Sequence, residues 1–284
     1  MTASPHSFGI AGLLGFPVSH SRSPVIHNHW LARYGIAGRY VLFNVPPERL
    51  QDALHGLSAL GLRGCNVTTP HKQAVMPLIA HVDPLARKIG AVNTIVVEDD
   101  GSLSGLNNDG NGFVQSVRDA RPTWRPDIGP IAVIGAGGSA RAVVASLAVQ
   151  GAREVRVVNR TLVRAQQMAS DYGPPVQAVP WDRRADALDG VALVVNCTTE
   201  GSAGREPLDL SLDRLPRDAI VGDLIYVPKE TPLLAAARAR GNLGVNGLGL
   251  LLNQARPAFQ AWFGVLPDIT PELIAAIEAT FPRS

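Results

Sequence analysis

A glycine-rich segment, Gly135-Ala136-Gly137-Gly138-Ser139-Ala140, lies between the apolar run Ile131–Ile134 and a helix-like segment, Ser139–Gln150. In a G-x-G-x-x-A turn the first glycine permits a tight turn and the second lets the backbone approach a pyrophosphate. The alanine keeps the helix close to the strand, and the helix N-terminus offers free N–H groups to the anion. Glycine turns also occur for packing alone. Here the strand–turn–helix context is present, so we predict dinucleotide binding.

The end of the next strand-like run indicates which dinucleotide binds. Sites for NAD usually place Asp or Glu there to hold the ribose diol. This chain has Asn159-Arg160-Thr161 instead, with Arg164 one turn further. A carboxylate would repel a 2′-phosphate, whereas guanidinium groups pair with it. Thr161 could merely cap the helix while both arginines are solvated, but capping and phosphate binding are compatible, and we predict NADP(H).

Polar groups follow several predicted strands of the first third of the chain, where ligands gather in open α/β folds. Each has a plain structural alternative. Lys72 could be a solvated surface lysine, Asp109 and Ser23 could be helix caps, Asn93 could be a turn residue, and Gln254 could lie on an exposed helix face. The segments concerned are Ser19–Pro24, Asn66–Lys72, Gly90–Thr94 and Gly105–Gly112.

Taken together, these segments resemble the shikimate dehydrogenase family, which includes shikimate and quinate dehydrogenases. The family's HSxSP, NVTxPxK, GAVNT, NxDGxG, GAGGxxR and NRT patterns occur here in family order. Further matches extend the resemblance over nearly the whole chain: Asn196–Gly201, Tyr226–Pro228, Gly247–Gly249 and Gln254-Ala255.

The resemblance implies a role for each matching residue. Lys72 and Asp109 match the catalytic pair, and Ser21 and Ser23 are expected to hold a ring carboxylate. Asn108 adjoins the expected substrate hydroxyls. The remaining expected contacts are Thr68, Asn93, Gln254 and Tyr226 with substrate, and Thr198 and Gly247 with cofactor.

The implied reaction is the reversible NADPH-dependent reduction of 3-dehydroshikimate to shikimate, a step of aromatic amino-acid biosynthesis. Hydride transfer to a carbonyl leaves an alkoxide, which needs a nearby proton and positive charge. A lysine ammonium supplies both, and an adjacent carboxylate fixes it in place. The enzyme expected is thus an NADP-dependent oxidoreductase acting on a CH–OH group.

Two alternatives stay open. The first is a paralogue that uses quinate or an aminoshikimate, since Asn108 stands where the family commonly has Thr. His71 and Leu250 also depart from the common Phe and Met. The NADP prediction and the serine pair favour shikimate, because quinate's extra hydroxyl needs more room beside the carboxylate. The second is a non-catalytic NADP-binding regulator, which would not need both Lys72 and Asp109.

The elements around these residues alternate between strand and helix. In the first block we expect strands at 10–15, 40–45 and 65–67, helices at 23–34, 47–60 and near 72–79, and a hairpin formed by 93–97 and 103–106. Ser23 is expected to be the N-cap of its helix, with Pro24 at the first helical position.

The second block predicts a parallel sheet with helices on both faces. Its expected strands are 131–134, 155–158, 191–195 and 219–224, and its expected helices are 139–150 and 162–172; helices at 248–263 and 271–281 form the tail. We therefore predict a two-domain α/β protein. The family resemblance implies the roles and bounds of the domains: a substrate domain of 1–108 with 247–284, and a Rossmann-type NADP domain of 109–246.

Composition limits the other function classes. The 284 residues carry a net charge of +2 without a basic run, which gives nucleic-acid binding little support. We expect no metal, because neither HExxH nor paired CxxC spacing occurs. Met1–Ser7 lacks the pattern of a signal peptide, no apolar run reaches bilayer length, and Cys65 and Cys197 read as reduced thiols. The expectation is a cytoplasmic monomer or homodimer.

Overall fold

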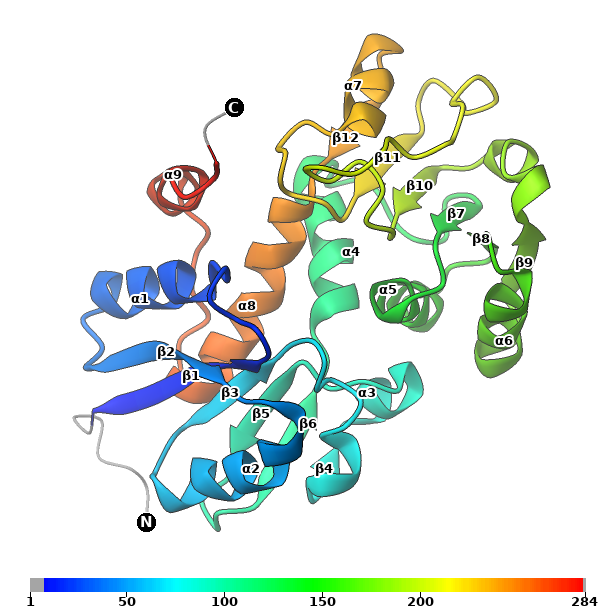
Figure 1. The fold of residues 1–284 in the computed structure, drawn as a ribbon. Helices are drawn as coiled ribbons and strands as arrows, with labels where there is room; N and C mark the ends of the chain where they lie inside the picture. Colours follow the sequence, from blue (N-terminus) through cyan, green and yellow to red (C-terminus); the bar gives the residue numbers. More distant parts are fainter. Residues whose placement is uncertain (1–7, 283–284) are drawn as a thin grey trace. The chain divides into compact units, whose positions relative to one another are not determined.

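The computed structural model describes residues 8–282, so the prediction about Met1–Ser7 lies outside the described residues. The chain folds into two compact units (Figure 1). The first ends at Asn108 and resumes at Gln254, and the second is Asp109–Asn253. The return to the first unit therefore falls inside a helix, seven residues after the predicted Gly247. Just before it, Asn253 Nδ2 donates to Asp119 Oδ2 of the second unit at 2.8 Å.

The first unit contains a six-stranded mixed sheet of order β2-β1-β3-β5-β6-β4. β1 pairs in parallel with β2 and β3, β5 is antiparallel to β3 and β6, and β4 is parallel to β6. The strands are β1 (Gly9–Gly15), β2 (Gly38–Asn44), β3 (Gly64–Val67), β4 (His81–Val82), β5 (Thr94–Val97) and β6 (Leu103–Leu106). The helical segments are α1 (Ser23–Arg33), η1 (Pro47–Arg49), α2 (Leu50–Ala59), η2 (Met76–Leu78), α3 (Pro84–Ile89), α9 (Pro271–Glu278) and the later turns of α8 (Gly247–Phe263).

Alternation along β1 sends neighbouring side chains to opposite faces of this sheet. Ala11 and Leu13 pack with Tyr40 and with Trp262 of α8. Leu14 packs on the other face, in a cluster that includes the buried leucines of α2. In Figure 1, α1 and α2 accordingly cover opposite faces of the first sheet.

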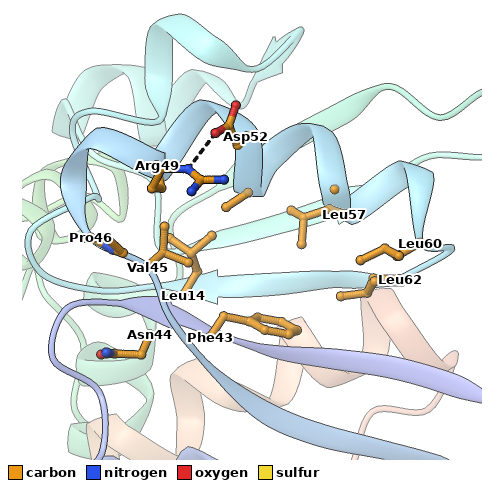
Figure 2. A pocket seen from close by; sticks show the side chains of 12 residues that line it. Leu14, Phe43, Asn44, Val45, Pro46, Arg49, Asp52, Leu57, Leu60 and Leu62 are labelled. Atoms are coloured by element: carbon orange, nitrogen blue, oxygen red, sulfur yellow. Dashed lines mark hydrogen bonds and ion pairs between the residues drawn. The ribbon is translucent and has the colours of Figure 1, made fainter.

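The face beneath α2 is incompletely filled. Between β2 and α2 lies a cavity of about 440 Å³, which has Leu14 and Phe43 among its apolar lining residues and the Arg49–Asp52 ion pair at its edge (Figure 2). Gly12 contributes no side chain here, and a Cβ at this position would lie only 2.4 Å from the Phe43 ring. The cavity is therefore a packing feature of β1, β2 and α2.

The second unit contains a six-stranded, wholly parallel sheet of order β12-β11-β10-β7-β8-β9. The order reverses between β7 and β10, which is the strand order of a dinucleotide-binding Rossmann fold. The strands are β7 (Ile131–Ile134), β8 (Val155–Asn159), β9 (Val176–Pro180), β10 (Leu193–Asn196), β11 (Ile220–Asp223) and β12 (Leu243–Val245). The helical segments are α4 (Asp109–Ala120), α5 (Gly138–Val149), α6 (Leu162–Tyr172), η3 (Trp181–Arg183), η4 (Asp186–Leu188), α7 (Pro232–Ala239) and the first turns of α8.

Helices cover both faces of this second sheet, as predicted. Val221 of β11 packs in a cluster with Leu233 and Leu234 of α7. A Cβ on the next residue, Gly222, would lie 2.9 Å from the ring of Phe113 in α4. α7 and α4 thus lie on opposite faces.

Two local predictions are wrong. The segment 72–79 is a series of turns followed by η2, because Pro77 has no N–H with which to continue a helix. Ser23 is the first residue of α1, and Arg22 is the N-cap without a side-chain cap hydrogen bond. Thr161, for which capping was the structural alternative, is the N-cap residue of α6 but makes no side-chain cap hydrogen bond. Among residues 8–282, no helix is long and apolar enough to span a membrane.

Candidate functional site

The predicted phosphate-binding turn forms at the carboxyl end of β7. Gly135 adopts φ of +111°, a conformation open chiefly to glycine. An added Cβ on Gly137 or Gly138 would meet no atom within 4 Å, so the space beside these glycines is open. Ala140, in the first turn of α5, is fully buried. α5 begins at Gly138 with no side-chain cap, so the space beside these N–H groups is open to an anion. The turn therefore fits a pyrophosphate.

The predicted clamp for a 2′-phosphate follows β8. Asn159 Nδ2 donates to the carbonyl of Thr161 at 2.8 Å, which fixes the turn into α6. The Arg160 side chain is 73% exposed and its Nη2 lies 3.0 Å from Oε1 of Glu200. Arg164 is exposed in the first turn of α6. Two guanidinium groups are thus available at the end of β8.

Glu200 belongs to a loop after β10 that Asn196 organises. Asn196 Oδ1 accepts hydrogen bonds from Thr198 N at 2.9 Å and Thr198 Oγ1 at 2.7 Å. Asn196 Nδ2 donates to the carbonyl of Glu200 and to Oδ1 of Asp223, both at 3.1 Å. Thr198 Oγ1 accepts from Glu200 N at 3.1 Å. The backbone on either side of Glu200 is therefore held.

Asp223 is a buried residue that supports this loop. Besides Asn196, it accepts hydrogen bonds from Ile225 N at 3.1 Å and from Thr231 Oγ1 at 2.7 Å. Burial raises the pKa of Asp223 from 3.8 to about 6, although these hydrogen bonds oppose the shift. The Asp223 carboxyl group thus has a structural role at the end of β11, where it accepts hydrogen bonds from three neighbouring residues.

These features come together at one point of the second sheet. A Cβ on Gly135 would lie 3.1 Å from Cγ2 of Thr198, and Glu200 reaches Arg160. The turns after β7, β8 and β10 therefore meet where the strand order reverses, which is where open α/β sheets bind dinucleotides. These three turns contain most of the predicted cofactor residues: Gly135 to Ala140, Asn159 to Thr161, and Thr198.

The remaining predicted residues of the second unit lie at the ends of helices and strands. Asp109 is half-buried and begins α4, and Tyr226 is half-buried after β11. Gly247 begins α8, where its N–H donates to the carbonyl of Ile225 at 3.1 Å and a Cβ would lie 2.1 Å from the carbonyl oxygen of Leu224. Only glycine fits that close approach.

In the first unit a chain of hydrogen bonds joins several predicted residues. Ser21 Oγ donates to Ser23 Oγ at 3.2 Å and also accepts from Ser23 N at 3.2 Å. Tyr40 OH donates to Asn66 Oδ1 at 2.8 Å. Burial raises the pKa of Tyr40 well above 10.0, and a hydrogen bond involving Ser23 opposes that rise. The two serines thus bond to each other, and Tyr40 bonds to Asn66.

The same chain continues to Asn93. Asn66 Nδ2 donates to Thr94 Oγ1 at 3.2 Å, and Thr94 Oγ1 donates to Asn93 Oδ1 at 2.9 Å. Asn93 Nδ2 donates to Gln254 Oε1 at 3.4 Å, and Asn93 Oδ1 accepts from Asn108 N at 3.0 Å. Asn108 Nδ2 donates to Thr94 Oγ1 at 3.2 Å. The structure therefore gathers Asn93, Asn108 and Gln254, which are far apart in sequence.

Lys72 and Thr68 lie on the turn after β3. Thr68 N donates to the carbonyl of Leu14 at 2.9 Å, and the Lys72 carbonyl accepts from Val92 N at 2.8 Å. Lys72 is half-buried. His71 is buried, and its Nε2 lies 2.7 Å from the Val45 carbonyl. His71 therefore anchors this turn. The catalytic pairing of Lys72 with Asp109 stays a prediction.

Sequence reasoning missed several residues of these two networks, among them Asn196, Asp223 and Thr231 around the loop after β10. Asn66 and Thr94 lie inside the motifs that drew attention to Thr68 and Asn93, so their position was a usable signal. Tyr40 lies within a strand, and Glu200 lies in a matched segment with no chemical pattern around it. None of the predicted site residues lines the cavity of Figure 2.

Comparisons with known proteins bear on these sites. The model of the shikimate dehydrogenase substrate-binding domain matches residues 13–95, and that of shikimate/quinate 5-dehydrogenase matches residues 128–203. A shikimate dehydrogenase (NADP(+)) from Paramagnetospirillum magneticum is 53% identical over 94% of this chain and 97% of its own length.

Solved structures are similar to nearly the whole chain. Shikimate 5-dehydrogenase from Thermus thermophilus, in complex with NADP(H) and shikimate, has a TM-score of 0.85 at 34% identity, covering 97% of this chain and all of that one. Quinate dehydrogenase from Corynebacterium glutamicum, in complex with NAD, has a TM-score of 0.86 at 31% identity, covering 95% and 98%. With these likenesses over both units, the chain belongs to the shikimate dehydrogenase family.

Proposed function

We propose that the protein catalyses the reversible NADPH-dependent reduction of 3-dehydroshikimate to shikimate. The observation that carries this proposal is the near full-length identity of 53% to a shikimate dehydrogenase (NADP(+)). The serine pair and the asparagine network of the first unit, and the glycine turn of the second, also support it. The product serves aromatic amino-acid biosynthesis.

In this proposal the first unit binds the ring acid. The paired hydroxyls of Ser21 and Ser23 hold its carboxylate, because hydroxyl groups donate charge-assisted hydrogen bonds to anions. Asn93 and Gln254, joined at 3.4 Å, present amide groups to the ring hydroxyls. Thr68 and Tyr226 complete the expected substrate contacts.

The bound dinucleotide supplies a hydride to the carbonyl carbon. Lys72 Nζ stabilises the developing alkoxide and donates the proton that completes the alcohol. Asp109 holds the ammonium group in position. In the oxidising direction the same pair removes the proton, as microscopic reversibility requires.

The choice of NADPH rests on the end of β8. Asn159 stands where an NAD site has a carboxylate, and Arg160 with Arg164 offers guanidinium groups to a 2′-phosphate. Thr198 and Gly247 are proposed to line the remaining cofactor path.

We propose a cytoplasmic location and an assembly no larger than a dimer. Two free cysteines, Cys65 and Cys197, suit a reducing compartment. Light scattering after size exclusion tests the assembly, and a tetramer or larger particle would contradict it. Fractionation of the source cells tests the location, which recovery outside the cytosolic fraction would refute.

The decisive experiment is a steady-state panel of shikimate, quinate and aminoshikimate, each with NADP and NAD. We expect the highest kcat/KM for shikimate with NADP. Loss of NADPH absorbance on adding 3-dehydroshikimate checks the reverse direction. Binding of NADPH without its oxidation would favour a regulator, and a preference for quinate would trace to Asn108 and its neighbours.

A further inference from the structure

The Arg160–Glu200 ion pair lies within the proposed site for the 2′-phosphate. Arg160 Nη2 and Glu200 Oε1 are 3.0 Å apart, and the Glu200 side chain is only 21% exposed. The Glu200 carboxylate is therefore less hydrated than the Arg160 guanidinium. A carboxylate at this place is unexpected, because a negative charge repels a phosphate.

The position of Glu200 is imposed by the loop after β10. Its N–H donates to Thr198 Oγ1 and its carbonyl accepts from Asn196 Nδ2, both at 3.1 Å. Asn196 in turn is held by the buried carboxyl of Asp223. The carboxylate thus extends from a fixed backbone towards the arginine.

An incoming phosphate monoester carries a charge of about −1.5 to −2 at neutral pH. It competes with Glu200 for the same guanidinium group and gains less than it would from an uncommitted arginine. An unphosphorylated ribose makes no such demand on Arg160. Glu200 therefore weakens the binding of a dinucleotide with a 2′-phosphate more than the binding of a dinucleotide without one.

We propose that Glu200 holds the Arg160 guanidinium in the free protein and must release it to a 2′-phosphate, so that Glu200 moderates the site's preference for phosphorylated dinucleotides. This inference rests on the proposed function, because it takes Arg160 as the phosphate clamp. Glu200 acts through Arg160 and is a positioning residue.

The test measures the binding of adenosine 2′,5′-bisphosphate and 5′-AMP to the full chain by calorimetry. These two probes differ only in the 2′-phosphate, and neither requires turnover. We expect Glu200→Gln to tighten binding of the bisphosphate about three- to fivefold, the range for removing a competing exposed ion pair. Binding of 5′-AMP should change less than about twofold, as a neutral ribose hydroxyl does not compete for the arginine.

Glu154→Gln is a matched control. Glu154 also pairs with an arginine, Arg156, at 2.7 Å, but it precedes β8 and so lies at the opposite end of this strand from Arg160. The Glu154→Gln substitution removes the same charge from the same unit, and it should leave the affinities for the bisphosphate and for 5′-AMP unchanged. In an Arg160→Ala background, the effect of Glu200→Gln should fall below about twofold, because no guanidinium remains to release.

The outcomes separate the two proposals. If the unaltered protein binds the bisphosphate no better than 5′-AMP, the NADP clamp fails and the Glu200 inference fails with it. If the unaltered protein prefers the bisphosphate but Glu200→Gln leaves that preference unchanged or lowers it, only the Glu200 inference is overturned. A full-sized effect without Arg160 overturns it as well.

Discussion

The backbone of Lys72 is fixed independently of its ammonium group. Its carbonyl accepts from Val92 N at 2.8 Å, and the preceding His71 N donates to the Thr68 carbonyl at 2.9 Å. Buried His71 also anchors the turn through its ring. A truncated side chain at position 72 therefore leaves the turn after β3 intact, and its effect reports on chemistry.

We expect Lys72→Ala to lower kcat by about 10²–10⁴-fold, the usual contribution of a positioned acid or base. NADPH affinity, measured by its fluorescence on binding, should change little. Lys88→Ala, which alters an exposed lysine of α3, serves as the control and should keep full turnover. Retained turnover in the Lys72 variant would remove this lysine from the mechanism.

Arg160 carries the cofactor preference at the same scale. We expect Arg160→Ala to raise the KM for NADP about 10- to 100-fold, because a charge-assisted hydrogen bond to phosphate is lost. The KM for NAD should rise far less. Arg153→Ala removes another exposed arginine, 3.9 Å from Asp127, and controls for net charge. Equal increases for NADP and NAD would dismiss the clamp.

Residue identities in the sequence were enough to find motifs, but not to find which side chains bond to one another. Asn93 and Gln254 are separated by 161 positions and meet only in the folded first unit. The Arg160–Glu200 pair joins two loops that follow strands not adjacent in sequence. Ser23 was expected to be a cap, yet Ser23 N instead donates to Ser21 Oγ. Such pairings depend on topology, which local spacing does not encode.

Among the elements, β2 shows how a sheet edge is closed. It is the outer strand of the first sheet, and outer strands offer unpaired N–H and C=O groups to other chains. Asn28 of α1 satisfies both groups of Tyr40: its Nδ2 donates to the Tyr40 carbonyl, and its Oδ1 accepts from Tyr40 N, each at 2.9 Å. One side chain thus replaces a neighbouring strand at this residue.

We expect Asn28→Ala to lower the free energy of unfolding by about 1–3 kcal/mol, because two backbone groups lose their partners. Urea unfolding followed by circular dichroism measures this. Asn28→Asp keeps the acceptor and loses the donor, so its loss should be smaller. If Asn28→Ala unfolds at the same urea concentration as the unaltered protein, the side chain does not secure the edge.

Periodic elements were the predictable part of the fold. α6 has the predicted bounds, Leu162–Tyr172, and the hairpin of β5 and β6 forms around the Asp99-Asp100-Gly101 turn. Other elements were not predicted. β4 has two residues and β12 three, too few for an alternating pattern to appear, but β9, with five residues, and α7, with eight, were missed as well. The false helix at 72–79 shows an apolar spacing outweighed by Pro77.

For the whole molecule, the two sheets differ in strand direction, and the sequence revealed only part of this difference. The second is all parallel, as the alternation of strands and helices predicted. The first is mixed because β5 and β6 form a hairpin whose strands continue the sheet beyond β3. Both units bury titratable groups, and these make global stability depend on pH.

His27 in the first unit and Asp223 in the second act in opposite directions. Burial lowers the pKa of His27 from 6.5 to about 3, so its contribution to stability is present above pH 6.5 and is lost as pH falls towards 3. Burial raises the pKa of Asp223 to about 6. Its contribution is present below pH 3.8 and is lost as pH rises through 6. A variant at either residue isolates the contribution of that residue to the pH dependence of the free energy of unfolding.

We expect Asp223→Asn to gain stability relative to the unaltered protein as pH rises from 4 to 7, by roughly 2–3 kcal/mol over that range. Between these values the folded protein holds a proton on Asp223 that the unfolded chain releases, so folding is increasingly penalised. The asparagine has the same shape and no charge, and it can donate to Thr231 Oγ1, which now donates to Asp223 Oδ2 at 2.7 Å. Urea unfolding at several pH values gives the difference. Asp209→Asn, which removes an exposed carboxylate that pairs with Arg184, is the control for the loss of one negative charge. A difference that is constant with pH would mean that Asp223 is ionised in the folded protein throughout this range.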